Sequence, residues 1–187
     1  MKYYKKIVGQ RLYLSPVSPE DADTYGRWKN EDQELALNFG QYPLMVTSKA
    51  DLGWLYAPPQ NKRQFAIVAL EGDALLGSIS IHNIDHLNRN AFIGICIGGE
   101  EQRGRGYGAE AIRLILNYGF KTLNLHSINL TVHADNAQGI ACYKKAGFRE
   151  VGRLPQVLFI DGRYVDKIYM SILESEFSAI EEAGKSE

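Results

Sequence analysis

Apolar and polar positions along this chain follow two periods, one typical of strands and one typical of helices. Alternation with a period of two, or a short apolar run, predicts strands over residues 11–17, 64–70, 75–81, 91–97, 127–132, 157–160 and 164–172. The clearest helical pattern follows residue 108, where apolar positions recur at three- and four-residue spacing through Ile112, Ile115, Leu116, Gly119, Phe120 and Leu123. One face of this helix is therefore expected to pack on a sheet.

Capping and stop residues predict further helices. Residues 18–21, Ser-Pro-Glu-Asp, combine an N-cap serine, a proline at the first helical position and an acidic third position, and predict a helix that ends near residue 30. Thr47 or Ser48 can cap a second helix through residue 55, which the prolines that follow would stop. Asn136 is a good N-cap for a short helix that Gly147 ends.

This order of elements predicts an α/β (α+β) fold with a mixed, mostly antiparallel central sheet of about six to seven strands and helices on both faces. Strand 91–97, the long helix and strand 127–132 form one βαβ unit, whose first loop lies where ligands bind in such sheets. We expect a single domain over residues 1–176, followed by a polar tail over residues 177–187 that frays.

Composition narrows the classes of partner. The chain has 187 residues, of which 45% are hydrophobic and 23% charged, and its net charge of −1 gives no basic footprint for nucleic acid or a membrane surface. We find neither a secretion signal nor an apolar run of the ~18–20 residues that a membrane span needs, which favours the cytoplasm. The only two cysteines, Cys96 and Cys142, are expected to pack as small hydrophobic residues, and no metal site is expected.

The most informative stretch is residues 103–108, Arg-Gly-Arg-Gly-Tyr-Gly, between a predicted strand and the long helix. Glycines let the backbone approach a ligand and adopt positive φ, and consecutive amides in such a turn bind anions together with the helix N-terminus. Arg103 and Arg105 add positive charge. The segment predicts a site for a phosphorylated ligand; an RNA-binding Arg-Gly tract is the weaker alternative, because such tracts are long and disordered.

Two signatures in order resemble those of the GNAT superfamily of acyl-CoA-dependent N-acetyltransferases. The first is a loop that begins with Gln or Arg and ends in spaced glycines, which Arg103, Gly106 and Gly108 match. The second is an Asn that caps a short helix, a Tyr seven residues later and a closing Gly-Phe pair, which here are Asn136, Tyr143 and residues 147–148. One helix and one strand lie between the signatures, as in the family.

The resemblance extends over roughly residues 10 to 175. Residues 11–14 and the Ser-Pro-Glu-Asp helix start look like the branch that acetylates the N-termini of ribosomal proteins. Residues 159–164 with Asp166 are shared by that branch and by the bacterial spermidine acetyltransferases. The branches share a scaffold and differ in substrate.

The resemblance implies an acetyl-CoA co-substrate and a set of residues that bind it. The loop would hold the pyrophosphate through Arg103, Gly104, Arg105, Gly106, Tyr107 and Gly108. The pantetheine arm would lie along strand 91–97, against the main chain of Ile95, Cys96 and Ile97, and Asn136 would contact it. One strand amide would polarise the thioester carbonyl, and the Tyr143 hydroxyl would give a proton to the departing thiolate.

The general base stays open in the sequence. Relatives in the ribosomal branch often carry a Glu early in the strand that corresponds to 91–97, but Phe92 and Ile93 are apolar here. The alternatives are a chain of waters or one of Glu100, Glu101, Asp135, His82 and His133. No pattern in the sequence chooses among them.

The acceptor is expected to be a small-molecule or peptide primary amine, with a protein or peptide N-terminus favoured and a polyamine such as spermidine or spermine as the alternative. A non-catalytic acyl-CoA sensor is a third hypothesis, and the chain is expected to be a monomer or a homodimer. Contacts to the acceptor are expected from the first two helices and the terminal hairpin, with candidates Tyr25, Trp28, Asp32, Glu34, Tyr42 and residues 159–164.

Overall fold

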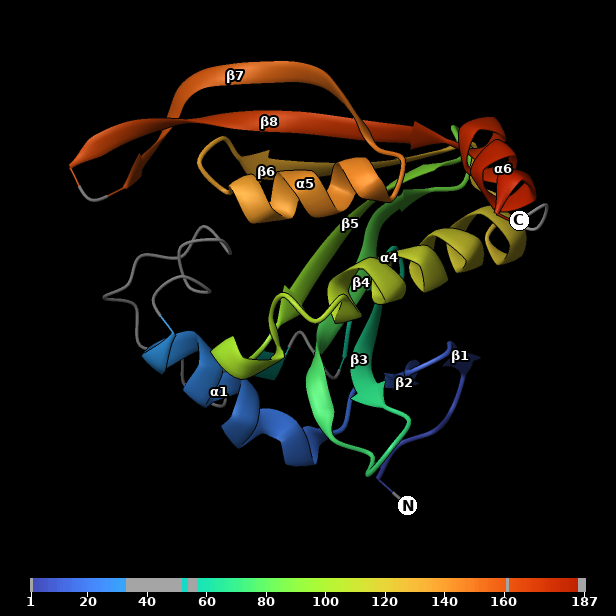
Figure 1. Ribbon diagram of the computed structural model, residues 1–187, viewed down its shortest axis with the longest axis vertical. Coiled ribbons are helices and arrows are strands. Elements are labelled where there is room, and N and C mark those ends of the chain that lie inside the picture. The colour runs from blue at the N-terminus through green and yellow to red at the C-terminus, as the bar shows by residue number, and fades with distance from the viewer. Residues whose placement is uncertain (1, 33–51, 54–56, 161, 185–187) are drawn as a thin grey trace.

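The computed structural model describes residues 2–32, 52–53, 57–160 and 162–184, and these form one eight-stranded sheet with helices around it (Figure 1). The strands are β1 (Ile7–Val8), β2 (Leu12–Pro16), β3 (Arg63–Ala69), β4 (Leu75–Asp85), β5 (Asn90–Ile97), β6 (Ser127–His133), β7 (Arg149–Ile160) and β8 (Arg163–Leu173). Their spatial order is β1-β2-β3-β4-β5-β6-β8-β7, and only β5 and β6 are parallel. The mixed, mostly antiparallel sheet is confirmed; the strand beyond the expected number is β1, which is too short to carry an alternating pattern.

The helices also follow the sequence signals. They are α1 (Ala22–Glu31), α4 (Tyr107–Asn117), α5 (Ala137–Lys145) and α6 (Glu174–Ala183), with 3-10 turns at Pro19–Asp21 and Glu100–Gln102. Ser18 caps the first turn by accepting a hydrogen bond from the Glu20 amide. The second predicted helix, near residues 47–55, lies almost entirely outside the described residues.

Both faces of the sheet are covered. Apolar residues of β2 to β6 and β8 pack under α4, α5 and α6 in the main core, where Ile112, Ile115 and Leu116 of α4 are fully buried. Tyr25 of α1 packs on the opposite face with Leu52, and Tyr13 and Val68 form a third cluster on that side. The expectation of helices on both faces is therefore confirmed.

The long amphipathic helix ends differently from its pattern. The spacing predicts one helix through Leu123, whereas α4 stops at Asn117 and a π-helical segment, Tyr118–Thr122, continues it. A Cβ at Gly119 would lie 2.6 Å from Ile128 Cδ1 of β6, so the backbone itself presses on the sheet here. The wider turn keeps Phe120 buried while the chain bends toward β6.

The parallel pair β5 and β6 separates along its length. Their paired residues are Asn90 with Ser127, Ala91 with Ile128 and Phe92 with Asn129, whereas β5 stays paired with β4 as far as Ile97. In the described part of the chain, β6 therefore pairs only with the first three residues of β5. The remainder of β5 runs past the start of α5 with one edge turned away from β6.

The end of the chain corrects one expectation. Residues 177–183 do not fray, because they belong to α6, where Phe177 is 3% exposed and packs on Phe120 at 5.4 Å between ring centroids. The expectation of a frayed tail rested on the polar composition and overlooked the buried Phe177. Residues 185–187 lie outside the described chain. None of the helices in the described ranges has the length and apolar content to span a bilayer.

Candidate active site

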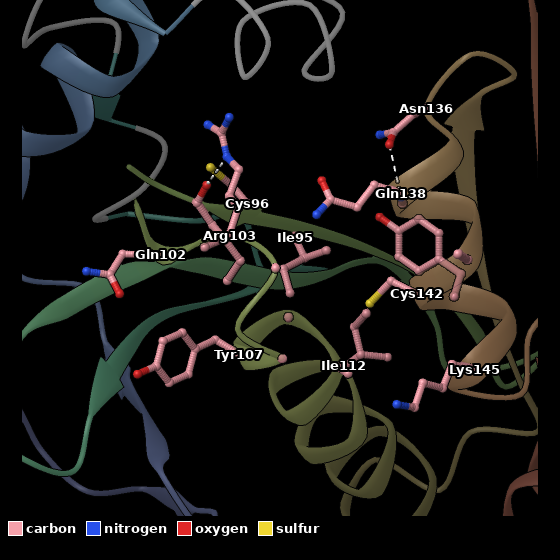
Figure 2. Close-up of a pocket in the computed structure, with 18 residues that line it drawn as sticks. Ile95, Cys96, Gln102, Arg103, Tyr107, Ile112, Asn136, Gln138, Cys142 and Lys145 are labelled. Atoms are coloured by element: carbon pink, nitrogen blue, oxygen red, sulfur yellow. Dashed lines mark hydrogen bonds between the residues drawn. The ribbon is translucent and has the colours of Figure 1, made fainter. Parts of the chain in front are cut away.

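A cavity of about 390 Å³ lies between β5, the glycine loop, α4 and α5 (Figure 2). Figure 2 shows Asn136, Gln138, Cys142 and Lys145 on α5 along one side, with Tyr107 and Ile112 of α4 below. Of the residues predicted from the sequence, the cavity is lined by Ile95, Cys96, Ile97, Arg103, Gly104, Gly106, Tyr107, Gly108, Asn136 and Tyr143. Elements that are distant in the sequence thus converge as expected.

The glycine loop has the geometry of an anion site. Gly104 and Gly106 have φ of 71° and 84°, a conformation that other residues rarely adopt. Gly106 is the N-cap of α4 and offers no side chain to the amides of the first helical turn. Those amides line the cavity together with the positive end of the helix dipole, so the loop fits a pyrophosphate.

Arg11 and Glu110 connect the glycine loop and α4 to the chain before β2 through hydrogen bonds. Arg11 Nη1 donates to the Arg105 carbonyl at 2.9 Å, Arg11 Nε donates to Glu110 Oε2 at 3.0 Å, and the guanidinium lies 5.0 Å from the centroid of the Tyr107 ring. Glu110 Oε1 accepts from the amides of Gln10 and Arg11 at 2.7 and 2.8 Å. The start of β2 is thereby fixed to the first turn of α4.

The protonation of Glu110 reflects this network. Burial alone would raise its pKa, but hydrogen bonds from the main chain and side chain of Arg11 and from the amides of Gln10 and Leu12 outweigh burial and lower the pKa. The sequence reasoning missed both Arg11 and Glu110. The only sequence signal for Glu110 is an acidic residue in the first turn of a helix. Such residues are common because they interact favourably with the helix dipole, so the signal does not indicate a contact with Arg11.

The two loop arginines differ in role. The Arg103 guanidinium forms an ion pair with Asp32 at the end of α1 and donates through Nε to the Ile97 carbonyl at 3.3 Å. Arg105 is exposed and does not line the cavity, although its carbonyl accepts the bond from Arg11. The side chain of Arg103 thus joins the loop to α1 and β5.

The second signature lies on α5. Asn136 Oδ1 accepts from the Gly139 amide at 2.8 Å, which is the N-cap predicted from the sequence. Tyr143 lines the cavity and packs edge-on against Phe148, with ring centroids 6.1 Å apart. Burial, and to a lesser degree Cys142 and Cys96, raises the pKa of Tyr143 well above its usual range. Its hydroxyl is therefore protonated at neutral pH, and it makes no hydrogen bond to any of the described residues.

Comparison with known proteins agrees with this geometry. The family described as "Acetyltransferase (GNAT) domain" matches residues 11–149. The spermidine N(1)-acetyltransferase of Escherichia coli K12 is 30% identical over 166 residues, which cover 89% of this chain and 88% of that protein. This chain belongs to the GNAT acetyltransferase family.

Further relatives point in two directions within the family. The putative ribosomal N-acetyltransferase YdaF of Bacillus subtilis 168 is 28% identical over 179 residues, covering 91% of this chain and 95% of that protein. The crystal structure of spermidine N-acetyltransferase from Vibrio cholerae in complex with CoA and spermine matches with a TM-score of 0.81 at 28% identity, covering 91% of this chain and 99% of that one. Both branches named by the sequence resemblance are thus present among the relatives.

Membership of the GNAT family makes the chain an N-acetyltransferase with acetyl-CoA as co-substrate. When bound, acetyl-CoA supplies an activated acetyl thioester. The loop amides at Gly104 to Gly108 and the α4 N-terminus fit its pyrophosphate. The β5 edge that has left β6 fits a pantetheine arm, which bonds main chain like an added strand. The protonated Tyr143 hydroxyl has the state required of a proton donor.

Both cysteines line the cofactor cavity: Cys96, as the resemblance implied, and Cys142, which the sequence analysis treated only as a packing residue. Burial raises the pKa of the Cys96 thiol to about 12, and burial also raises that of Cys142, against the opposing effect of Lys145. Each thiol therefore stays protonated at neutral pH, where it is a poor nucleophile. The expectation that they act as packing residues fits these environments.

The structure separates the candidate bases. Glu100 and Glu101 are exposed in the 3-10 turn before the loop, and Asp135 forms an ion pair with Arg163 at 2.7 Å. His133 is buried at the end of β6, where burial lowers its pKa. His82 lies on β4, in hydrogen-bond contact with Ser80.

The acceptor-side candidates are partly engaged in packing. The Tyr25 hydroxyl donates to the Gly77 carbonyl at 3.2 Å, and the Trp28 ring lies against Gly98 at the end of β5. Asp32 holds Arg103. Glu34, Tyr42 and Asp161 lie outside the described residues, whereas Phe159 and Tyr164 at the tip of the terminal hairpin are about half exposed or more.

Proposed function

We propose that this chain transfers the acetyl group of acetyl-CoA to a primary amine of a polyamine such as spermidine or spermine. The similarity to the V. cholerae enzyme in complex with CoA and spermine carries this proposal, because it extends over 91% of the chain. The E. coli spermidine enzyme supports it from the sequence, over 89% of the chain. Our first expectation from the sequence, a protein or peptide N-terminus, has less support.

The protein N-terminus remains the second candidate, since the similarity to YdaF, a putative ribosomal N-acetyltransferase, is of comparable length and identity. The two acceptors differ in charge and reach. A polyamine brings several ammonium groups, whereas a peptide N-terminus brings one amine and a main chain that can pair with a strand edge. The acceptor side of the site must therefore differ between the two functions.

The deciding experiment is a competition among amines. The protein is incubated with acetyl-CoA and equal concentrations of spermidine, spermine and a set of short peptides with free N-termini, and the products are identified by mass spectrometry. Acetylspermidine or acetylspermine in excess over acetylated peptide supports the proposal. Acetylated peptide with unmodified polyamine overturns it, and Gly106→Glu provides the background rate.

A further inference from the structure

The face of the sheet opposite α4 and α5 carries a polar pair, Ser80 and His82 of β4, beside Gly94 of β5. We propose that His82, oriented by Ser80, is the general base that takes the proton of the acceptor amine, and that the amine approaches from this face. The inference rests on acetyl transfer to an amine as proposed above, but not on the amine being a polyamine.

Strand register decides which way these side chains point. On β4, Ile79 and Ile81 pair with Ile95 and Ile93 of β5, and Ile79, Ile81 and Ile93 are buried in the core beneath α4. Side chains alternate between the two faces of a strand, so Ser80 and His82 point to the other face. α5 and the cofactor cavity lie on the core side, which leaves His82 across the sheet from them.

Gly94 of β5 lies directly beside Ser80 and His82. A Cβ placed on Gly94 would lie 3.6 Å from Ser80 Oγ and 3.7 Å from His82 Cε1, the ring carbon that is bonded to both nitrogens. The next residue, Ile95, lines the cofactor cavity, and β6 pairing has already ended at Phe92. The nitrogen-bearing edge of His82 therefore lies over the stretch of β5 where the strand has left β6.

The local contacts favour a neutral imidazole with a free nitrogen. His82 Nδ1 lies 3.3 Å from Ser80 Oγ, and when Nδ1–H donates to this oxygen, Nε2 keeps its lone pair for a proton. The ring is tilted against Phe92 at 6.3 Å, and Lys62 is the charged group that acts on it, with Lys29 of α1 acting in turn on Lys62. Burial first, and Lys62 second, lower the pKa of His82.

In the proposed transfer, one proton passes from the amine to His82 and one from Tyr143 to the sulfur. The neutral amine nitrogen forms a bond to the thioester carbon and becomes positively charged, which makes its proton acidic. His82 Nε2 takes this proton, the carbon–sulfur bond breaks, and the sulfur takes the Tyr143 hydroxyl proton. The proton on His82 returns to Tyr143 through solvent. With His82 as the base, β5 needs no glutamate of the kind that relatives in the ribosomal branch often carry early in this strand, where this chain has Phe92 and Ile93.

The test compares His82→Gln with His86→Gln, a histidine in the exposed turn after β4. His82→Gln is expected to lower kcat by about 10²-fold or more, as loss of a general base does. The Kd of acetyl-CoA by isothermal titration calorimetry is expected to change less than about twofold, since the residue lies across the sheet from the cavity. His86→Gln is expected to match the wild type in both measurements.

The pH profile and chemical rescue separate a base from a structural residue. In the wild type, kcat/KM is expected to fall as the pH drops through the lowered pKa of His82, and this acid limb is absent in His82→Gln. Added imidazole is expected to restore part of the kcat of His82→Ala. Ser80→Ala, which removes only the orienting oxygen, should shift the acid limb without abolishing turnover.

Gly94→Ala gives an independent check. The new methyl group meets its neighbours at ordinary contact distances, so the protein should fold and bind acetyl-CoA, yet the methyl occupies the space beside His82 and should lower kcat about tenfold or more. An unchanged kcat and acid limb in His82→Gln overturns the base assignment. Failure of the proposed function is a different result: another amine is acetylated in place of polyamines, and the same variants are then measured with that amine.

Discussion

The helices α4 and α5 both begin at the cofactor cavity, but their first turns are completed in different ways. At α5, Asn136 caps the Gly139 amide with its own side chain. At α4, the N-cap is Gly106, with a φ of 84° and no side chain to offer. One helix start has a side-chain cap from the chain itself, and the other has none.

The difference shows that a helix N-terminus can either be stabilised by a cap or be left uncapped to bind an anion. A capped N-terminus stabilises its helix, whereas an uncapped N-terminus beside positive-φ glycines is an anion site. The start of α4 is held from outside by Arg11, which bonds the Arg105 carbonyl, and by Glu110, which accepts from the amides of Gln10 and Arg11 just before β2. Changes at the α4 start should therefore affect mainly ligand affinity. Changes at the α5 start, where Asn136 also lines the cavity, should affect mainly stability.

The largest effect is expected from Gly106→Glu. A side chain here is strained at a φ of 84°, and its Cβ would lie 3.1 Å from Nη2 of Arg11, which bonds the loop. The disturbed loop and the added negative charge should weaken acetyl-CoA binding by roughly 100-fold or more. Calorimetry with acetyl-CoA measures this directly. Affinity equal to that of the wild type would mean that the loop does not bind the pyrophosphate.

Tyr143→Phe should come next and should separate chemistry from binding on the α5 side. Removal of the hydroxyl is expected to lower kcat by about 10²-fold, as loss of a proton donor does, while the Kd of acetyl-CoA stays near that of the wild type. Steady-state kinetics together with calorimetry tests both parts. A kcat equal to that of the wild type would remove Tyr143 from the mechanism.

Glu110→Gln sharpens the comparison by weakening the external support of α4. The variant loses charged hydrogen bonds to the Arg11 side chain and to the main-chain amides just before β2, and the KM for acetyl-CoA is expected to rise about three- to tenfold with little change in kcat. The variant Glu181→Gln breaks the ion pair of this α6 residue with Arg113 of α4. Neither residue lines the cavity, so the variant serves as the matched control.

The same variant has a signature in acid stability. Because the folded pKa of Glu110 is lowered, its ionised form stabilises the protein above the unfolded pKa, and this contribution is lost as the pH falls through the folded value. Glu110→Gln should therefore show a flatter dependence of Tm on pH in the acid range below the ordinary glutamate pKa. A slope equal to that of the wild type would show that the carboxylate does not couple loop and strand.

The smallest effect is expected at the α5 start. Asn136→Ala removes the bond to the Gly139 amide and should lower the free energy of unfolding by about 1 kcal/mol, whereas Asn136→Ser should retain most of it. Denaturant unfolding measures the difference. If acetyl-CoA affinity fell as far as in Gly106→Glu, the two helix starts would not differ as proposed.

Local chemistry explains which parts of the protein the sequence predicted. Gly106, Asn136 and Gly147 act through their own backbone or within three residues, so the positive φ at Gly106 and the start and end of α5 were predictable from the sequence. Glu110 and Arg11 act across about a hundred positions, and no periodicity reports such a contact. His82 and Gly94 meet only through the register of β4 and β5, which the sequence does not fix.

Two misjudged segments follow the same rule. The polar composition after residue 176 outweighed one apolar side chain, Phe177, which is buried in the core, and ion pairs of Glu176 and Glu181 also join α6 to its neighbours. The apolar spacing after Asn117 matches an α-helix, whereas the structure has a π-helical segment there, where Gly119 lies close against Ile128 of β6. In both cases a tertiary contact overrides a local tendency.

The separation of β5 from β6 after Phe92 has a thermodynamic consequence. If the separated edge of β5 bonds a ligand, ligand binding is coupled to folding. A ligand that binds only the native state raises the free energy of unfolding with the logarithm of its concentration. A hundredfold excess over Kd would contribute about 2.7 kcal/mol. The melting temperature of this enzyme should thus report the acetyl-CoA supply around it.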